Sequence, residues 1–274
     1  MTVALSIKVN DGVVLATDSA STIMAQTPDG NIGVINVYDN ANKLFNLHKG
    51  LPIGIITWGA GSIGFESTST IIKNFRKEIT NNIIKLDVNN YNVEEIAGKF
   101  TEFLMDRYKK AYNEWPEKPE IGFIISGYSS SSNMPEEWII EIRNGESNGP
   151  TLLRKQEDCG LTWQGQPEAI TRLISGFSGN LPAILIQSGL VKAGQEEKLI
   201  SMIRDNCCAE VITPAMPIKD AIDLAEFLVD LTEKFVRFSP GAQTVGGPIE
   251  IAAITEHEGF KWIKRKHYYD KSFN

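Results

Sequence analysis

The stretch MTVALSIKVNDGVVLATDSAST, residues 1–22, contains two apolar runs separated by a short polar turn. The first run, residues 3–9, alternates and is rich in β-branched side chains, and residues 13–18 form the second run. The Asp11-Gly12 pair between them is a strong signal for a tight hairpin. Two antiparallel strands that turn there place residue 18 opposite about residues 3 to 5. The stretch therefore predicts a hairpin that returns the chain to its own start.

Thr2, at the start of this hairpin, directly follows Met1. A small second residue normally permits removal of the initiator methionine, which would leave Thr2 with a hydroxyl group and a free α-amine. The hydroxyl can act as a nucleophile, and the amine, with an ordinary pKa of about 7.7–8.0, can act as its general base. Taken alone, a threonine at this position is far more often an ordinary strand residue. The hairpin makes a catalytic role for Thr2 more credible, because it places Asp18 beside Thr2.

Asp18 ends the second run among small residues, and a carboxylate buried there would need a cation. Lys43, in the stretch DNANKLF, opens the next apolar run and is the candidate partner. A lysine held near Thr2 would disfavour protonation of the α-amine and favour the alkoxide. Each residue also has an ordinary interpretation, as a turn carboxylate and as a solvated lysine at a strand end.

The composition narrows the functional class. The chain has 274 residues and a formal net charge of −7, which argues against nucleic-acid binding. The short basic run KWIKRK, residues 261–266, is interpreted as a solvated strand face. The three cysteines, two of them adjacent, lack the spacing of a disulfide framework or a metal cluster, and the three histidines are scattered, so we expect no metal, no cofactor and no Ser-His-Asp triad. We expect no signal peptide, and, because no apolar run reaches about 18 residues, we expect a cytoplasmic protein without a membrane span.

Hydrophobic periodicity predicts clustered strands and paired helices. This order favours an α+β class with antiparallel sheets covered by helix layers, in a single domain over 1–274. The stretch 178–215 reads as an insertion, and 24–40 as a loop. We expect strands over 3–9, 13–18, 43–59 (a hairpin), 121–129, 136–145, 150–155 and 249–266 (a hairpin), and helices over 62–81, 91–114, 166–177, 194–206 and 217–236.

The first 64 residues resemble the start of proteasome β-subunits and HslV-type threonine peptidases. The likeness lies in TVALSIKVNDGVVLATDSAST, in the Asn-x-x-Lys stretch of residues 40–43, and in GIITWGAGSIG, residues 54–64. On these motifs the chain is identified as a divergent bacterial-type homologue of that family. The resemblance implies the N-terminal nucleophile (Ntn) hydrolase fold, a four-layer αββα sandwich of two antiparallel sheets between helix layers.

The resemblance also implies roles for particular residues. Thr2 would be the nucleophile, Asp18 and Lys43 its charged pair, and the elbow at Gly59 would supply a backbone N–H to the oxyanion, with Ala60 as the alternative. The substrate would bind as an added strand along the chain edge, beside a pocket wall. The residues expected to contact it are Ser21, Thr22 and Trp58, the last of which is equally well explained as a core aromatic.

The chain departs from the family pattern in its supporting groups. The turn TWQGQP would place Gln164 where the family has a serine. The stretch SPGAQTVGGPIEIA offers no aspartate, although Thr244 could stand in for a serine. These departures put the rate of any reaction in question.

Three functions follow as hypotheses. The first is a threonine-type endopeptidase that acts on peptides or unfolded proteins through an acyl-enzyme on Thr2, in a homo-oligomeric ring, with an ATPase partner left open. The second is an Ntn amidohydrolase that acts on a small amide, since a fold does not fix a function. The third is a non-catalytic structural ring subunit.

Overall fold

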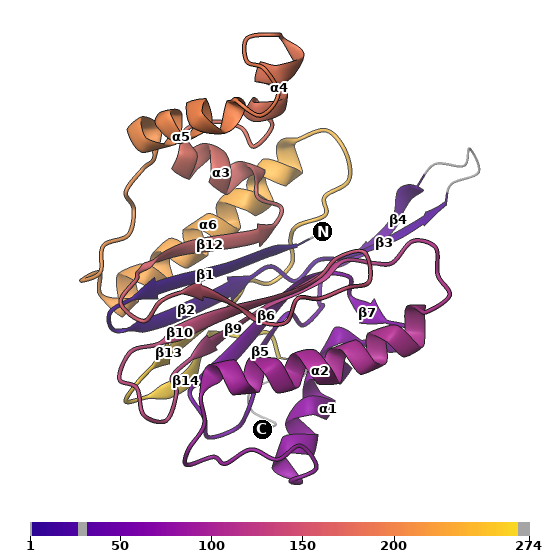
Figure 1. Ribbon diagram of the computed structural model, residues 1–274, viewed down its shortest axis with the longest axis vertical. Coiled ribbons are helices and arrows are strands. Elements are labelled where there is room, and N and C mark those ends of the chain that lie inside the picture. Colours follow the sequence, from indigo (N-terminus) through magenta and orange to yellow (C-terminus); the bar gives the residue numbers. More distant parts are fainter. Residues whose placement is uncertain (1, 27–31, 268–274) are drawn as a thin grey trace.

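Two antiparallel sheets form the centre of the computed structural model, which describes residues 2–26 and 32–267 (Figure 1). The first, sheet I, has the strand order β12-β1-β2-β13-β14, and the second, sheet II, has the order β11-β10-β9-β6-β5. Sheet I consists of β1 (Val3–Val9), β2 (Gly12–Thr17), β12 (Gly160–Gly165), β13 (Glu250–Thr255) and β14 (Gly259–Lys264). Sheet II consists of β5 (Leu44–Asn46), β6 (Ile53–Gly59), β9 (Ile121–Gly127), β10 (Glu136–Ile142) and β11 (Thr151–Arg154).

Helices cover the outer face of each sheet, as Figure 1 shows. Helices α1 (Thr68–Thr80) and α2 (Val93–Tyr112) share an apolar cluster with sheet II, whereas α3 (Glu168–Ser175) and α6 (Ile218–Phe238) share one with sheet I. A third cluster, which includes Leu15, Ile56 and Ile124, fills the space between the sheets. The fold is therefore the expected α+β sandwich with the layers helix, sheet, sheet, helix.

The opening hairpin returns residue 18 to the predicted place opposite residues 3–5, although its turn lies one residue before the expected Asp11-Gly12 pair. Ala4 pairs with Thr17, and Val9 pairs with Gly12, so the turn lies at Asn10 and Asp11. Both strands are buried along their whole length, because one face packs on α6 and the other on sheet II. The hairpin thus carries the chain start and Asp18 into the interior of the molecule.

Two predicted loops are strands. The expected excursion over 24–40 is a two-stranded sheet, β3 (Ser21–Gln26) and β4 (Ile32–Tyr38), which projects from one end of the sandwich (Figure 1); residues 27–31 of that prediction lie outside the described residues. The expected turn after residue 160 is β12, which pairs with β1. Turn-forming residues obscured these strands in the sequence: Pro28, Asp29 and Gly30 between β3 and β4, and two glycines at the ends of β12.

Two short elements precede the first helix. The predicted helix from residue 62 begins only at Thr68, after β7 (Ser62–Ile63) and β8 (Glu66–Ser67). Ser67 caps this helix, since its side chain accepts the backbone N–H of Thr70. The other predicted helices lie within a few residues of their expected bounds.

The segment expected to be an insertion forms α4 (Leu181–Gln187) and α5 (Glu196–Cys207), which lie beyond α3 at one end of the molecule (Figure 1). Helix α4 has no buried residue, and α5 buries only Ile200 among its described residues. Within the described residues, no helix combines the length and the apolar character needed to cross a membrane.

Candidate active site

A small cavity of about 80 Å³ lies where β1 starts and β6 ends. Six of the seven residues predicted from the sequence line it: Thr2, Ser21, Thr22, Lys43, Trp58 and Gly59. The seventh, Asp18, lies behind the cavity wall and is bound to Lys43. The fold thus brings together residues that lie up to 57 positions apart in the chain.

Asp18 is fully buried and accepts hydrogen bonds on both carboxylate oxygens. Its Oδ1 accepts the Val3 N–H at 3.1 Å and the Lys43 ammonium at 2.7 Å. Its Oδ2 accepts the N–H groups of Ala20 at 3.0 Å and Gly246 at 3.2 Å. These four donors offset the cost of burying a carboxylate. Asp18 therefore fixes the start of β1, its own loop and Lys43 relative to one another.

Lys43 is the cation that faces Thr2's cavity, and its side chain is only 8% exposed. Burial lowers the pKa of its amine below the ordinary value, and the nearby Lys266 cation lowers the pKa further. The charge and hydrogen bond of Asp18 oppose that change without cancelling it. Lys43 can therefore donate hydrogen bonds to a reacting oxygen while it loses its proton more readily than a solvated lysine.

Gly59 is the last residue of β6 and has a φ of +85°, which a side chain rarely tolerates. A Cβ there would lie 2.4 Å from the carbonyl oxygen of Glu120, so only glycine fits. The Thr57 N–H donates to the Lys43 backbone carbonyl at 3.0 Å, on the side of β6 that faces β5. Every second N–H group of a strand points to the same side, so the Gly59 N–H points to the same side as the Thr57 N–H. It extends past the end of β5, where no strand within the described residues pairs with it.

The alternative oxyanion donor, Ala60, has its N–H engaged. It donates to the Glu120 carbonyl at 2.9 Å, on the other side of the strand. An N–H group committed to the backbone offers no hydrogen bond to a substrate. The geometry favours Gly59 over Ala60 for that role.

Trp58 serves the cavity wall and the core together. Its ring lies so close to Gly122 that a Cβ on that glycine would be 2.2 Å away, and the residue also packs against the cluster between the sheets. On the opposite wall, Ser21 starts β3 and its Oγ lies 3.7 Å from the position of a Cβ on Gly61. The cavity is thus a narrow slot between the start of β3 and the end of β6.

The turn that contacts Thr2 lies two residues later than expected. Gln164 pairs with Ala4 inside the sheet, and the Gln166 N–H donates to the Thr2 carbonyl at 2.7 Å. A Cβ on Gly165, which has a φ of +90°, would lie 1.9 Å from that carbonyl oxygen. The placement of Gln164 in the turn was therefore wrong, because β12 extends further than its sequence indicates. Thr244 is buried and lines a second cavity together with Gln166.

Sequence reasoning missed a second buried ion pair beneath the site. The Lys266 ammonium donates to Glu250 at 2.8 Å, to Ser19 Oγ at 2.6 Å and to the Ala41 carbonyl at 2.6 Å. The basic run 261–266 was interpreted as solvated, which is wrong for Lys266, whose side chain is 8% exposed. Strand alternation gave no indication of this, because Lys266 lies beyond the end of β14 and Lys264, two residues earlier, is exposed.

A further carboxylate, Glu233 on α6, lies near Asp18. Its Oε1 is 3.8 Å from the position of a Cβ on Gly246, the residue whose N–H binds Asp18. Partial burial raises the pKa of Glu233, and the negative charges of Asp230 and Asp18 act in the same direction. Within the described part of the chain, no group of three His, Cys, Asp or Glu side chains is placed to hold a metal ion.

Known proteins support the fold without settling the activity. No family model and no curated protein matches the sequence. Among solved structures, Anbu (ancestral beta-subunit) from Yersinia bercovieri is 14% identical with a TM-score of 0.53, covering 97% of this chain and 89% of that one. An Anbu (Gly-1) mutant from Hyphomicrobium sp. strain MC1 is also 14% identical with a TM-score of 0.55, covering 100% of this chain and 90% of that one.

These matches correct the expected family. The quoted motifs describe a strand, turn and elbow arrangement, which related families with one fold can share, so they could not separate those families. Anbu proteins are proteasome-like but distinct, and the assignment to proteasome β-subunits or HslV-type peptidases was wrong. At this identity the likeness shows the fold alone: a proteasome-related, Ntn-like sandwich shared with Anbu structures.

Proposed function

We propose that the chain is an N-terminal threonine hydrolase that cleaves peptide bonds through an acyl-enzyme on Thr2, once Met1 is removed. The observation that supports this most is the meeting of Thr2, Lys43 and Gly59 in one cavity, with Asp18 bound behind it. A structural protein would have no need of a buried cation facing an N-terminal hydroxyl group. The proteasome-related fold is consistent with such a hydrolase.

The chemistry follows from the geometry of these groups. Thr2 Oγ attacks the carbonyl carbon of the scissile bond, and its proton passes to the α-amine of the same residue. The Gly59 N–H donates to the oxyanion that forms. Collapse breaks the C–N bond, and the α-amine delivers the proton to the leaving amine. Water then hydrolyses the ester, which releases the acid and restores the Thr2 hydroxyl.

Lys43 and Asp18 position and polarise this nucleophile. The Lys43 cation faces the cavity and stabilises negative charge on Thr2 Oγ, while Asp18 holds Lys43 in place. The peptide would lie as an extended strand between Ser21–Thr22 and the end of β6. Trp58 would form the wall of the pocket for its side chain. We further propose that the chain assembles as a homo-oligomeric ring, which light scattering or mass photometry can measure.

The test is the state of the N-terminus. Intact mass should show that Met1 is absent, and a threonine-directed β-lactone or epoxyketone should add its mass at Thr2. Thr2→Ala should abolish both labelling and hydrolysis, Thr2→Ser should retain labelling, and Thr151→Ala, an exposed threonine on β11, should change neither. Active protein that retains Met1 would refute the mechanism.

The cavity volume supports a second candidate. A volume of about 80 Å³ is well below the roughly 300–1,000 Å³ of most small-molecule sites. It admits one small group, which is either a peptide side chain or the acyl part of a small amide. A panel of fluorogenic peptides assayed beside a panel of small amides separates the two, because only the peptidase would depend on substrate length along Ser21 and Thr22.

A further inference from the structure

Another cavity, of about 860 Å³, shares Asn42 with the cavity at Thr2 and carries an unusual charge. Its lining holds five lysine and arginine side chains and one glutamate, which leaves a formal charge of +4 on a protein whose net charge is −7. The cationic residues are Lys49, Lys73, Arg76, Arg265 and Lys266. We call this the basic cavity. It lies within the size range of small-molecule sites, roughly 300–1,000 Å³.

Within residues 2–26 and 32–267, most of these cations have no carboxylate partner. Lys266 is paired with Glu250, the single acidic residue of the lining. Among the described residues, no ion pair joins Lys49, Lys73, Arg76 or Arg265 to a carboxylate. Unpaired like charges gathered in one hollow repel each other, and an anion that enters the hollow removes that repulsion.

The guanidinium groups of Arg76 and Arg265 lie near each other in the basic cavity. Arg76 is partly buried, and the pKa of its guanidinium is lowered first by burial and then by the positive charge of Arg265. The two cations therefore lie within electrostatic reach of each other. Arginine binds phosphate through paired N–H groups, so two neighbouring arginines provide a suitable site for a multiply charged phosphate.

Aromatic and amide groups complete the lining. Trp262 and Phe260 pack edge to face at 5.3 Å, and the Arg265 guanidinium lies over the Trp262 ring at 5.0 Å. The buried Asn46 Oδ1 has no hydrogen-bond partner within the described residues. Turning that amide over would present its N–H groups to an anion.

We propose that the basic cavity binds a polyphosphate group, carried either by inorganic polyphosphate or by a nucleoside triphosphate. This inference does not depend on the activity proposed for Thr2. The cavity nevertheless touches the same loop, because Asn42 lines both cavities and Lys266 holds the Ala41 carbonyl. A ligand there would contact the segment that positions Lys43.

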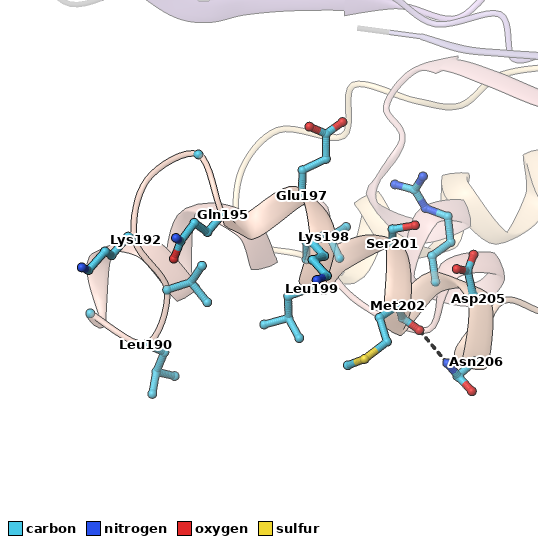
Figure 2. A pocket seen from close by; sticks show the side chains of 15 residues that line it. Leu190, Lys192, Gln195, Glu197, Lys198, Leu199, Ser201, Met202, Asp205 and Asn206 are labelled. Atoms are coloured by element: carbon cyan, nitrogen blue, oxygen red, sulfur yellow. Dashed lines mark hydrogen bonds between the residues drawn. The ribbon is translucent and has the colours of Figure 1, made fainter.

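A different surface cavity provides a matched control. It lies along the α4–α5 segment and has a volume of about 1360 Å³, so it is larger than the basic cavity (Figure 2). Its three cations, Lys192, Lys198 and Arg204, face two acids, Glu197 and Asp205, which leaves a formal charge of only +1. Removing the three cations of this control cavity changes the net charge of the protein without changing the basic cavity. It therefore tests whether the ligand responds to the net charge or to the basic cavity.

Isothermal titration calorimetry with inorganic triphosphate and with ATP, both in magnesium-free buffer, tests the proposal. Both ligands should bind the full chain, and the variant Lys73→Gln/Arg76→Gln/Arg265→Gln should lose about tenfold or more in affinity for each. The control Lys192→Gln/Lys198→Gln/Arg204→Gln should keep its affinity within about twofold, which is the ordinary scatter of such values. Tighter binding of ATP than of triphosphate would assign a contact to the base, whereas equal binding would assign the site to the phosphates alone.

If the triple variant does not fold, a single substitution still tests the proposal. Lys73→Glu changes a single exposed side chain on α1 and should by itself weaken triphosphate binding. The proposal is overturned if neither ligand binds at millimolar concentration, or if Lys73→Glu and the control triple lose affinity to the same extent.

Discussion

One carboxylate oxygen of Asp18 binds both Lys43 and the start of β1: Oδ1 accepts the Lys43 ammonium at 2.7 Å and the Val3 N–H at 3.1 Å. This single acceptor links the residue after Thr2 to the cation that faces Thr2's cavity. The pair is fully enclosed on the Asp18 side and nearly so on the Lys43 side. Its removal should therefore affect both the stability of the fold and the chemistry at Thr2.

Asp18→Ala should lower the free energy of unfolding by roughly 3–5 kcal/mol, because it leaves Lys43 as a buried cation without a partner. The double variant Asp18→Ala/Lys43→Met should recover part of that loss, since no isolated charge remains. Urea unfolding of the two single variants and the double variant measures the coupling. Strictly additive losses would contradict the ion pair.

The lowered pKa of Lys43 predicts how stability changes with pH. Below the folded-state pKa the amine is protonated in both states, and its burial penalty is present in full. As pH rises above that pKa, the unfolded chain still binds the proton that the folded chain has lost, so stability increases until about pH 10.5, the ordinary pKa of a lysine amine. Wild-type protein should therefore gain stability relative to Lys43→Met as pH rises from neutral towards this value. Parallel curves for the two proteins would refute the shift.

Gly59→Ala should damage folding and activity together. The positive φ and the contact with the Glu120 carbonyl should cost roughly 1–3 kcal/mol of stability. Displacement of the Gly59 N–H should lower kcat by about 10²–10³-fold in an active preparation. Gly98→Ala, in an open position on α2, is the matched control and should raise stability by about 0.5–1 kcal/mol. A fully active Gly59→Ala enzyme would exclude this N–H from the oxyanion site.

The elements that could be predicted from the sequence were those marked by a residue pattern within the element itself. The hairpin of β1 and β2 follows from the alternation of its residues and from the Asp11-Gly12 turn, and it places Asp18 beside Val3 as expected. Lys43 could be proposed as a partner because a buried carboxylate requires a cation. Strand β12 gave a weaker signal, since only Leu161 and Trp163 alternate in it and a glycine stands at each of its ends.

Apart from Asp18 and Lys43, the buried charges could not be predicted from the sequence. Lys8 lies in an alternating strand, where its position indicates a solvated face, yet it is fully buried and donates to the carbonyls of Lys155 and Gln156. Glu137 on β10 is also fully buried and pairs with Arg154 at 2.7 Å. Glu137 and Arg154 face each other on neighbouring strands of sheet II, whereas Lys8 reaches from sheet I to the loop after β11, so the stacking of the two sheets is what buries Lys8.

Lys266 is another buried cation that the sequence did not indicate, and it lies closer to the site. It can be compared with Lys264, two residues earlier. The Lys266 ammonium joins Ser19, Ala41 and Glu250, with side chains of Lys266 and Glu250 that are 8% and 3% exposed. Lys264 instead pairs with Glu226 at the surface, where the side chains are 47% and 37% exposed. The ion pairs are alike in kind and differ in burial.

Lys266→Met should cost roughly 3–5 kcal/mol in unfolding free energy, because Glu250 is left buried without a cation. Lys264→Met should cost at most about 1 kcal/mol, the upper end of the usual range for an exposed pair. The Lys266 variant should also lower kcat, since it releases the loops at Ser19 and Ala41 that flank Asp18 and Lys43, and Lys266→Arg should restore part of that loss. Urea unfolding and a kcat measurement on all three variants decide the matter. Equal stability losses for Lys266→Met and Lys264→Met would mean that the Lys266 contacts add nothing to the fold.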